Sequence, residues 1–169
     1  MRQLDLNIVV CPGCGLELES DTPELDQNYH ASVACRAVFD RLTAFSLTVQ
    51  DIDFVHQLAV DSYAAQHSGP PVKPISTAFA LIGLYLTFER GFNGKKVQKA
   101  HMMLGRTHRP WPLFNPPPGK ALQTVFDVVQ GLTRENYRAR LKTWGQAVWL
   151  FWSPEHENIR KLADTYLKM

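Results

Sequence analysis

Apolar residues recur every three or four positions through most of the chain after residue 31. This spacing gathers apolar side chains on one face of a helix. The clearest stripe consists of Tyr137, Leu141, Trp144, Val148 and Phe151. Ser, Thr or Pro marks the expected start of each helix, and Gly or Pro marks its expected end. We expect helices over 32–44, 48–67, 76–88, 95–104, 133–152 and from 154 onward.

The first residues and one later segment break this period. Two short apolar runs, 6–10 and 16–18, flank a turn that holds Pro12, Gly13 and Gly15. Such a turn reverses the backbone, so we expect a short hairpin. Residues 109–119 hold five of the eleven prolines, which excludes a helix and predicts an extended segment. Residues 122–129 fit either a short strand or one or two helical turns.

These elements predict a mainly α fold in a single domain over residues 1–169. Residues 1–35 would form a zinc-knuckle hairpin and loop, and residues 36–169 a helical bundle that includes the Pro-rich segment 109–119. Hydrophobic residues make up 45% of the chain and charged residues 20%, which is typical of a globular protein with a buried core.

The charge and the cysteine content of the chain limit the kinds of binding partner and the cellular compartment that we expect. The net charge is +2 and the densest basic cluster is only Lys95, Lys96 and Lys99, so we do not expect nucleic-acid binding. The most apolar stretch, 75–88, is too short and too polar to span a membrane. The N-terminus lacks the apolar run of an export signal. Three cysteines argue against a disulfide framework, so we expect a cytoplasmic protein.

The cysteines give the strongest indication of chemistry. Cys11 and Cys14 form a C-x-x-C motif with Pro and Gly between them, which lets two thiolates face one metal. Cys35 lies near an expected helix start, where the positive end of the helix dipole favours a thiolate. We therefore predict a structural zinc ion on Cys11, Cys14 and Cys35. A redox dithiol, three buried free thiols and a catalytic or sensing metal remain as alternatives.

A closed zinc site needs a fourth ligand. His30 gives the spacing C-x2-C-x15-H-x4-C and is the preferred choice. Asp21, His56, His67 and a water molecule are the alternatives. His56 and His67 share one face of an expected helix but lie roughly 16 Å apart along it, so they cannot both bind one ion.

Polar residues of this helix are also the candidates for catalysis. His56, Asp61 and His67, together with His101 or His156 from another helix, could line a second metal or acid–base site. The simpler interpretation is that His56 is a hydrogen-bonded core residue and that His67 is a favourable cation at a helix C-terminus.

Several motifs occur together in a fixed order. They are CPGCGL at 11–16, Cys35, HQLAVDSYAAQH at 56–67, ERG at 89–91 and WGQAVWLFW at 144–152. In this order they resemble a bacterial domain-of-unknown-function family, number 5946, over nearly the whole chain. The resemblance implies that the three cysteines and the HQLxxDxYxxQH segment belong to the family pattern, and that the protein is bacterial and cytoplasmic. It implies no activity, and it does not include His30.

Two functions compete. The preferred hypothesis is a zinc-stabilised module whose helical surface binds a protein partner. The alternative is a metalloenzyme with a His/Asp site in the helical bundle, so whether the protein is an enzyme stays open. Binding of nucleic acid through the knuckle and the lysines of 95–99 is a weaker alternative. The oligomeric state does not follow from the sequence.

Overall fold

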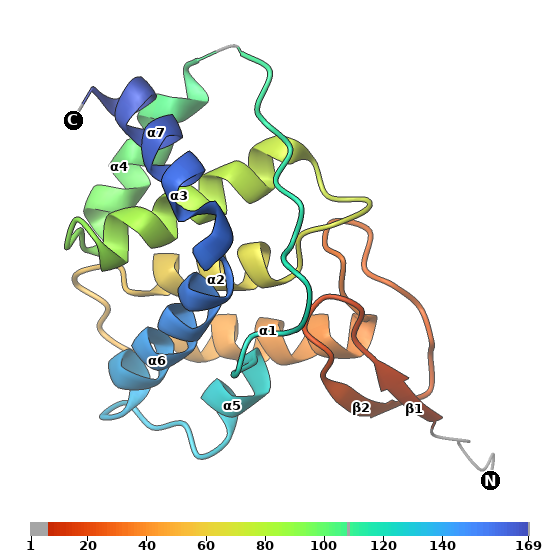
Figure 1. Ribbon diagram of the computed structural model, residues 1–169. Coiled ribbons are helices and arrows are strands. Elements are labelled where there is room, and N and C mark those ends of the chain that lie inside the picture. The colour runs from red at the N-terminus through yellow and green to blue at the C-terminus, as the bar shows by residue number, and fades with distance from the viewer. Residues whose placement is uncertain (1–6, 108, 169) are drawn as a thin grey trace, which may run out of the picture.

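The computed structural model describes residues 7–107 and 109–168, and it begins with a hairpin that leads into helices (Figure 1). Strands β1 (Asn7–Val10) and β2 (Glu17–Ser20) pair antiparallel, and Leu6 lies outside the described residues. The mainly α fold with an N-terminal hairpin is confirmed. The helices are α1 (Val33–Ser46), α2 (His56–Gln66), α3 (Pro74–Phe88), α4 (Gly94–Gly105), α5 (Val125–Val129), α6 (Tyr137–Phe151) and α7 (His156–Leu167), with a 3-10 turn at Ser153–Glu155 before α7.

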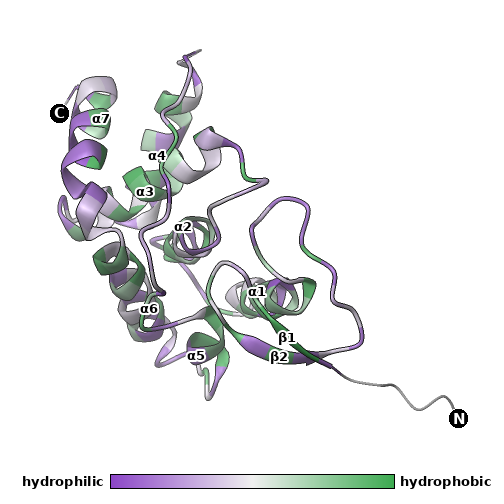
Figure 2. Ribbon diagram, turned by 45° about the vertical axis from the view of Figure 1, so that its right-hand side comes forward, coloured by the Kyte–Doolittle hydropathy of each residue, from purple (hydrophilic) through white to green (hydrophobic). Residues whose placement is uncertain are grey.

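Helix α2 lies at the centre of the protein. It contacts α1, α3, α4 and α6, and Figure 2 shows it nearly end-on among its neighbours. All of its residues except His56 and Val60 are buried. Several of these buried residues are polar, so the helix carries hydrogen-bonding groups into the core that must find partners there.

Helix α2 is shorter than the sequence pattern predicts. It begins at His56 rather than near Thr48, whose hydroxyl instead donates to the carbonyl of Phe45 in the last turn of α1. Asp51 supplies the cap from outside the helix. Its carboxylate accepts from the backbone N–H groups of Val55 at 2.7 Å and His56 at 2.9 Å. Asp51 therefore lies in the loop before α2 and not inside the helix expected over 48–67.

The Pro-rich segment has no helix, as predicted, and passes along the outside of the bundle before it reaches the N-terminal hairpin (Figure 1). Just after this segment, Lys120 Nζ donates to the carbonyl oxygens of Pro12 at 2.6 Å and Gly13 at 2.9 Å. The ambiguous residues 122–129 include α5, which Thr124 and Asp127 begin with a capping box. The extended segment thus connects the end of α4 to the turn between β1 and β2 that carries Cys11 and Cys14 (the cysteine turn).

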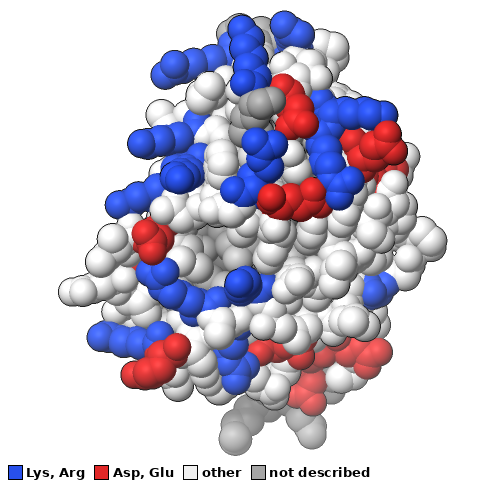
Figure 3. Space-filling view, turned by 60° about the vertical axis from the view of Figure 1, so that its left-hand side comes forward, with Lys and Arg blue, Asp and Glu red and all other residues white. Residues whose placement is uncertain are grey.

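The surface carries both signs of charge. On the face seen in Figure 3, Lys and Arg side chains are dispersed and Asp and Glu side chains lie among them. Lys95, Lys96 and Lys99 are exposed on α4. In the part of the chain that the structure describes, no helix is long and apolar enough to cross a bilayer. The assignment of the whole chain to a single domain stays a prediction.

Candidate metal centre

Three cysteines and one histidine meet between the hairpin and the helices. The ligand atoms of Cys11, Cys14, Cys35 and His67 all lie within 4.8 Å of one another. Cys11 and Cys14 lie in the turn after β1. Cys35 lies in the first turn of α1, and His67 follows α2 directly. Cys14 is 4% exposed and the other three are fully buried. The arrangement can therefore bind a metal ion out of contact with solvent.

The local backbone explains how the two cysteine elements approach each other. Ser32 caps α1 by accepting from the N–H of Cys35, which fixes the start of that helix beside the turn. Gly13 allows the turn to lie against the other side of the site. A Cβ at Gly13 would lie 2.4 Å from the His30 carbonyl oxygen and 2.7 Å from His67 Cδ2. Only glycine fits at this position without a shift of backbone.

His67 presents one ring nitrogen to the sulfurs. Its Nδ1–H donates to the Tyr63 carbonyl at 2.8 Å, because a carbonyl oxygen can only accept. In the neutral ring Nε2 then carries a lone pair, and it lies 3.4 Å from Cys35 Sγ. A backbone carbonyl that orients a histidine in this way is typical of metal ligands.

Tyr63 supports the site in a second way. Its hydroxyl donates to Cys35 Sγ at 3.7 Å, and its ring packs on the His67 ring with 3.9 Å between centroids. Burial raises the pKa of this phenol, which keeps the hydroxyl protonated and able to donate. Tyr63 thus orients both Cys35 and His67 without being a ligand itself.

Hydrogen bonds among the three thiols shift their pKa values in opposite directions. The Cys14 and Cys35 thiols donate hydrogen bonds to Cys11, which lowers the pKa of Cys11. Donation to Cys11 raises the pKa of Cys14 to about 12 and also raises the pKa of Cys35. The three sulfurs are free thiols rather than a disulfide. Three buried thiolates together would require a cation at their centre.

His30, the preferred fourth ligand from the sequence, is not among the residues that meet here. Its backbone N–H donates to the His67 carbonyl at 2.9 Å, and its ring lies against Gly69. Of the alternatives, Asp21 is exposed and the ring of His56 packs on Phe39, 6.4 Å between centroids. The histidine that lies with the three cysteines is His67, whose distance along the chain conceals its proximity to them.

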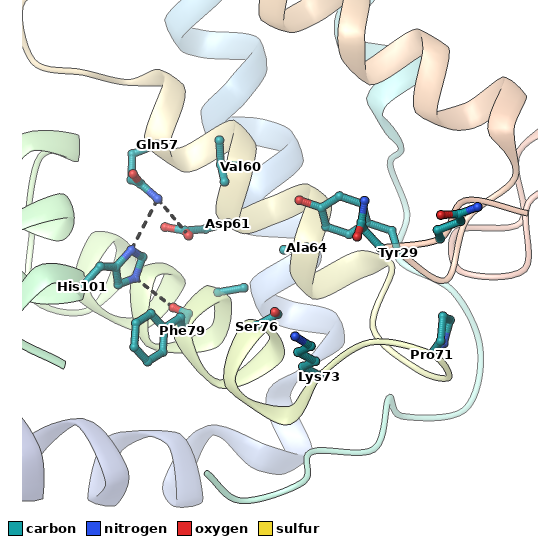
Figure 4. A pocket seen from close by; sticks show the side chains of 13 residues that line it. Tyr29, Gln57, Val60, Asp61, Ala64, Pro71, Lys73, Ser76, Phe79 and His101 are labelled. Atoms are coloured by element: carbon teal, nitrogen blue, oxygen red, sulfur yellow. Dashed lines mark hydrogen bonds between the residues drawn. The ribbon is translucent and has the colours of Figure 1, made fainter. Parts of the chain in front are cut away.

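A second polar cluster lies on another side of α2. Gln57 Nε2 donates to Asp61 Oδ1 at 3.1 Å and lies 3.5 Å from His101 Nδ1, while His101 Nε2 donates to the Phe79 carbonyl at 2.9 Å. These residues line a cavity of about 420 Å³ between α2, α3 and the loop before α1 (Figure 4). Of the candidate catalytic residues, Asp61 and His101 thus come together, whereas His56 and His67 lie elsewhere.

Burial controls the charge of this second cluster. It raises the pKa of Asp61 well above its usual range, and it lowers the pKa of His101. His56, which packs apart from both clusters, also has its pKa lowered by burial. Within residues 7–107 and 109–168, the Cys/His cluster is the one group of three or more His, Cys, Asp or Glu side chains arranged to hold a metal. Asp61 and His101 do not form a second such group.

The sequence alone did not indicate that Tyr63 contacts the Cys/His cluster or that Gln57 contacts Asp61 and His101. Both belong to pairs spaced by four residues: Gln57 with Asp61, and Tyr63 with His67. Residues four apart share a helix face, so the two pairs point to different neighbours. Gln66 has a third role, since it accepts from Trp144 Nε1 at 2.9 Å and donates to the Gln123 carbonyl at 2.7 Å. The two pairs spaced by four residues within the 56–67 motif were the signal in the sequence that this helix contacts two separate polar clusters.

Comparison with known proteins supplies a family but no activity. No curated protein and no solved structure is significantly similar to the chain. A family model matches residues 9–153, which include the three cysteines, His67 and the second polar cluster. The chain therefore belongs to DUF5946, a family of unknown function.

Proposed function

We propose that Cys11, Cys14, Cys35 and His67 bind a structural zinc ion, and that the protein is a zinc-stabilised binding module. Two sulfurs on a tetrahedral zinc lie about 3.8 Å apart, and a sulfur and a nitrogen about 3.5 Å apart, since the bonds are about 2.3 Å and 2.0 Å long. The distances here are 3.8 Å between Cys14 and Cys35 sulfurs and 3.4 Å between Cys35 Sγ and His67 Nε2. This match carries the proposal.

The burial of the four residues supports a structural role for the ion. Structural zinc sites have four protein ligands, whereas catalytic sites keep a position for water or substrate. All four side chains are at most 4% exposed. The ion would fasten the cysteine turn and α1 to the end of α2, three segments that are far apart in the sequence.

The binding role rests on what the zinc holds in place. The loop that follows β2 joins the hairpin to α1 and carries Asn28 and Tyr29, which line the cavity beside α2. The His30 N–H also bonds to the carbonyl of His67. Zinc would therefore fix one wall of the cavity. A protein partner on the helical surface stays a prediction that no contact of the structure tests.

Metal content of purified protein tests the zinc proposal. We expect about one zinc per chain in the wild type and in His30→Ala, and strong loss in Cys14→Ser and His67→Ala. His30→Ala is the matched control because it removes a nearby imidazole outside the cluster. Full zinc in His67→Ala together with loss in His30→Ala would overturn the ligand assignment. A metal other than zinc in the wild type would overturn the choice of ion.

A further inference from the structure

Two hollows adjoin at the turn between α3 and α4. One, of about 350 Å³, lies beside α4, and the other, of about 380 Å³, lies toward α6 and the loop before α2. Phe92 of the turn lines both of them. Figure 3 shows this face of the protein, with a depression near its middle and Lys and Arg side chains above and below it. We call the two hollows together the Phe92 groove.

Apolar side chains line the Phe92 groove and stay partly open to solvent. Val55, Phe88 and Phe92 are half-buried, and Met103 is 54% exposed. The other apolar residues of the lining are Leu58, Ala100 and Leu167. Because these side chains meet in a hollow, a partner side chain placed there would bury apolar surface on several sides at once.

Backbone contacts fix the walls of the groove. The Phe92 N–H donates to the Leu86 carbonyl at 2.9 Å, which holds the turn against the end of α3. The Lys95 N–H donates to the Asp53 carbonyl at 3.1 Å, which holds the start of α4 against the loop before α2. Gly94 allows this approach, since a Cβ there would overlap the backbone of that loop. Walls that are formed in advance lower the ordering cost of binding.

The charges around the Phe92 groove are mainly positive. Asp53 is the one acidic residue of its described lining, and it forms an ion pair with Arg138 at 3.1 Å. Lys96, Lys99 and Lys142 also line the groove, are exposed, and form no ion pair with any other residue that the structure describes. The two halves of an apolar groove thus carry cations that lack a counter-charge, so a partner with carboxylates complements them.

We propose that the Phe92 groove binds an acidic segment of a partner protein, in which Asp or Glu residues flank one or two bulky apolar side chains. The apolar side chains fill the hollows on either side of Phe92, and the carboxylates face Lys96, Lys99 and Lys142. This inference rests on the binding-module role proposed above, and it assigns to that role a surface and the chemistry of the partner.

The shape and lining of the groove favour a protein segment over other anionic partners. A bilayer takes up apolar side chains that project from a surface, whereas those around Phe92 line a hollow. Nucleic acid binds chiefly through its phosphates, and much of this lining is apolar. A peptide can place apolar and acidic side chains side by side, as the groove requires.

Selection of peptides on the purified protein tests the proposal. The probe is a displayed library of random short peptides. We expect the enriched sequences to combine Asp or Glu with Leu, Phe or Trp. Enrichment of basic peptides, of purely apolar peptides or of none at all would overturn the proposal.

Fluorescence anisotropy with the strongest selected peptide then locates its site. We expect binding to weaken about tenfold or more in Lys96→Glu and in Lys142→Glu, and several-fold in Met103→Ala. Lys73→Glu is the matched control, because it reverses another exposed lysine away from the groove, and it should bind as the wild type does. All four side chains are exposed, so the melting temperature should not change. Binding that survives the first three substitutions would overturn the assignment to the Phe92 groove.

Zinc analysis of the same samples keeps this inference separate from the proposed metal centre. A protein with full zinc that selects no acidic peptide would overturn the groove and leave the zinc site standing. A protein without zinc that still loses the peptide in Lys96→Glu would support the groove and overturn the zinc-stabilised role.

Three further probes represent the other occupants. A peptide of residues 17–28, which is acidic and carries Leu25, 56% exposed in the protein, represents a second copy of the chain. Vesicles that contain anionic lipid represent a membrane, and a single-stranded oligonucleotide represents nucleic acid. We expect each to bind at least about tenfold more weakly than the selected peptide. Equal or tighter binding of any of them would overturn the assignment to a partner protein.

Discussion

The two polar clusters on α2 differ in how completely their groups are satisfied. At the His67 end, each polar atom has an assigned role: Nδ1 donates to a carbonyl, Nε2 faces sulfur, and the Tyr63 hydroxyl donates to Cys35. At the Asp61 end, a buried oxygen has no partner and a cavity adjoins it. A closed, satisfied cluster suits a permanent structural ion, whereas an open, incomplete one suits a ligand that comes and goes. One helix thus leads to a closed cluster at its end and carries an incomplete one beside a cavity.

The largest effect should follow from breaking the closed cluster. Cys35→Ser would remove one of the four proposed ligands and leave two thiolates and an imidazole for the ion. Because metal binding is folding free energy in such sites, we expect a loss of several kcal/mol, comparable to the whole stability of a small domain. Thermal unfolding followed by circular dichroism measures it. An unchanged melting temperature with full metal content would contradict the role assigned to this cysteine.

A smaller but still large effect is expected from Gly13→Ala. The added methyl group would press on the His30 carbonyl and the His67 ring, at 2.4 Å and 2.7 Å. Overpacking of this kind costs about 2–3 kcal/mol, and here it should also weaken metal binding. Gly105→Ala is the control, because a Cβ there meets nothing within 4 Å. If both variants unfold in urea at the same concentration as the wild type, the close approach at Gly13 is not required.

Tyr63→Phe sharpens the comparison without disrupting the packing. The substitution removes the hydroxyl that donates to Cys35 Sγ at 3.7 Å and keeps the ring that packs on His67. We expect metal affinity to fall about tenfold, as is usual when a group that supports a ligand is lost. Competition with a chelator of known affinity measures the change. A melting temperature that drops as far as in Cys35→Ser would show instead that the hydroxyl has a packing role.

The smallest effect concerns the open cluster and is expected to be stabilising. Burial holds the pKa of Asp61 above its value in the unfolded chain, so folding is disfavoured as pH rises past the unfolded value of about 4. Asp61→Asn removes this penalty, so its gain in stability over the wild type should be larger at pH 8 than at pH 5. Urea unfolding of both metal-loaded proteins at the two pH values checks the sign. A difference that shrinks toward high pH would contradict the buried, neutral carboxyl group.

The periodic and the local features of the chain were predictable from sequence. Apolar periodicity gave the helices, and the density of Pro and Gly gave the hairpin turn and the extended segment. Helix α2 begins later than the sequence predicts, because Asp51 caps it from a loop and Thr48 bonds to the end of the preceding helix. Such a choice between two caps depends on how the loop packs, which the residues of the loop alone do not determine.

The metal site was predictable only in part, for a related reason. Cys11, Cys14 and Cys35 are recognisable from their motif and from the helix start. The fourth position depends on where the end of α2 falls relative to the hairpin, which is a tertiary property. His30 lies near Cys35 in sequence, yet only its backbone takes part, through the bond to the His67 carbonyl. The pairing of Asp61 with His101 likewise required the crossing of α2 and α4.

The order of the four ligands along the chain has a consequence for synthesis. Chains are made and begin to fold from the N-terminus. Cys11 and Cys14 emerge from the ribosome first and Cys35 follows, but the proposed ion could not be enclosed until His67 has appeared. Lys120, which holds the Pro12 and Gly13 carbonyls, comes later still. With the four proposed ligands, a nascent chain could hold an ion first through the three cysteines and enclose it only after His67 has been made, and the contact of Lys120 with the turn would form last.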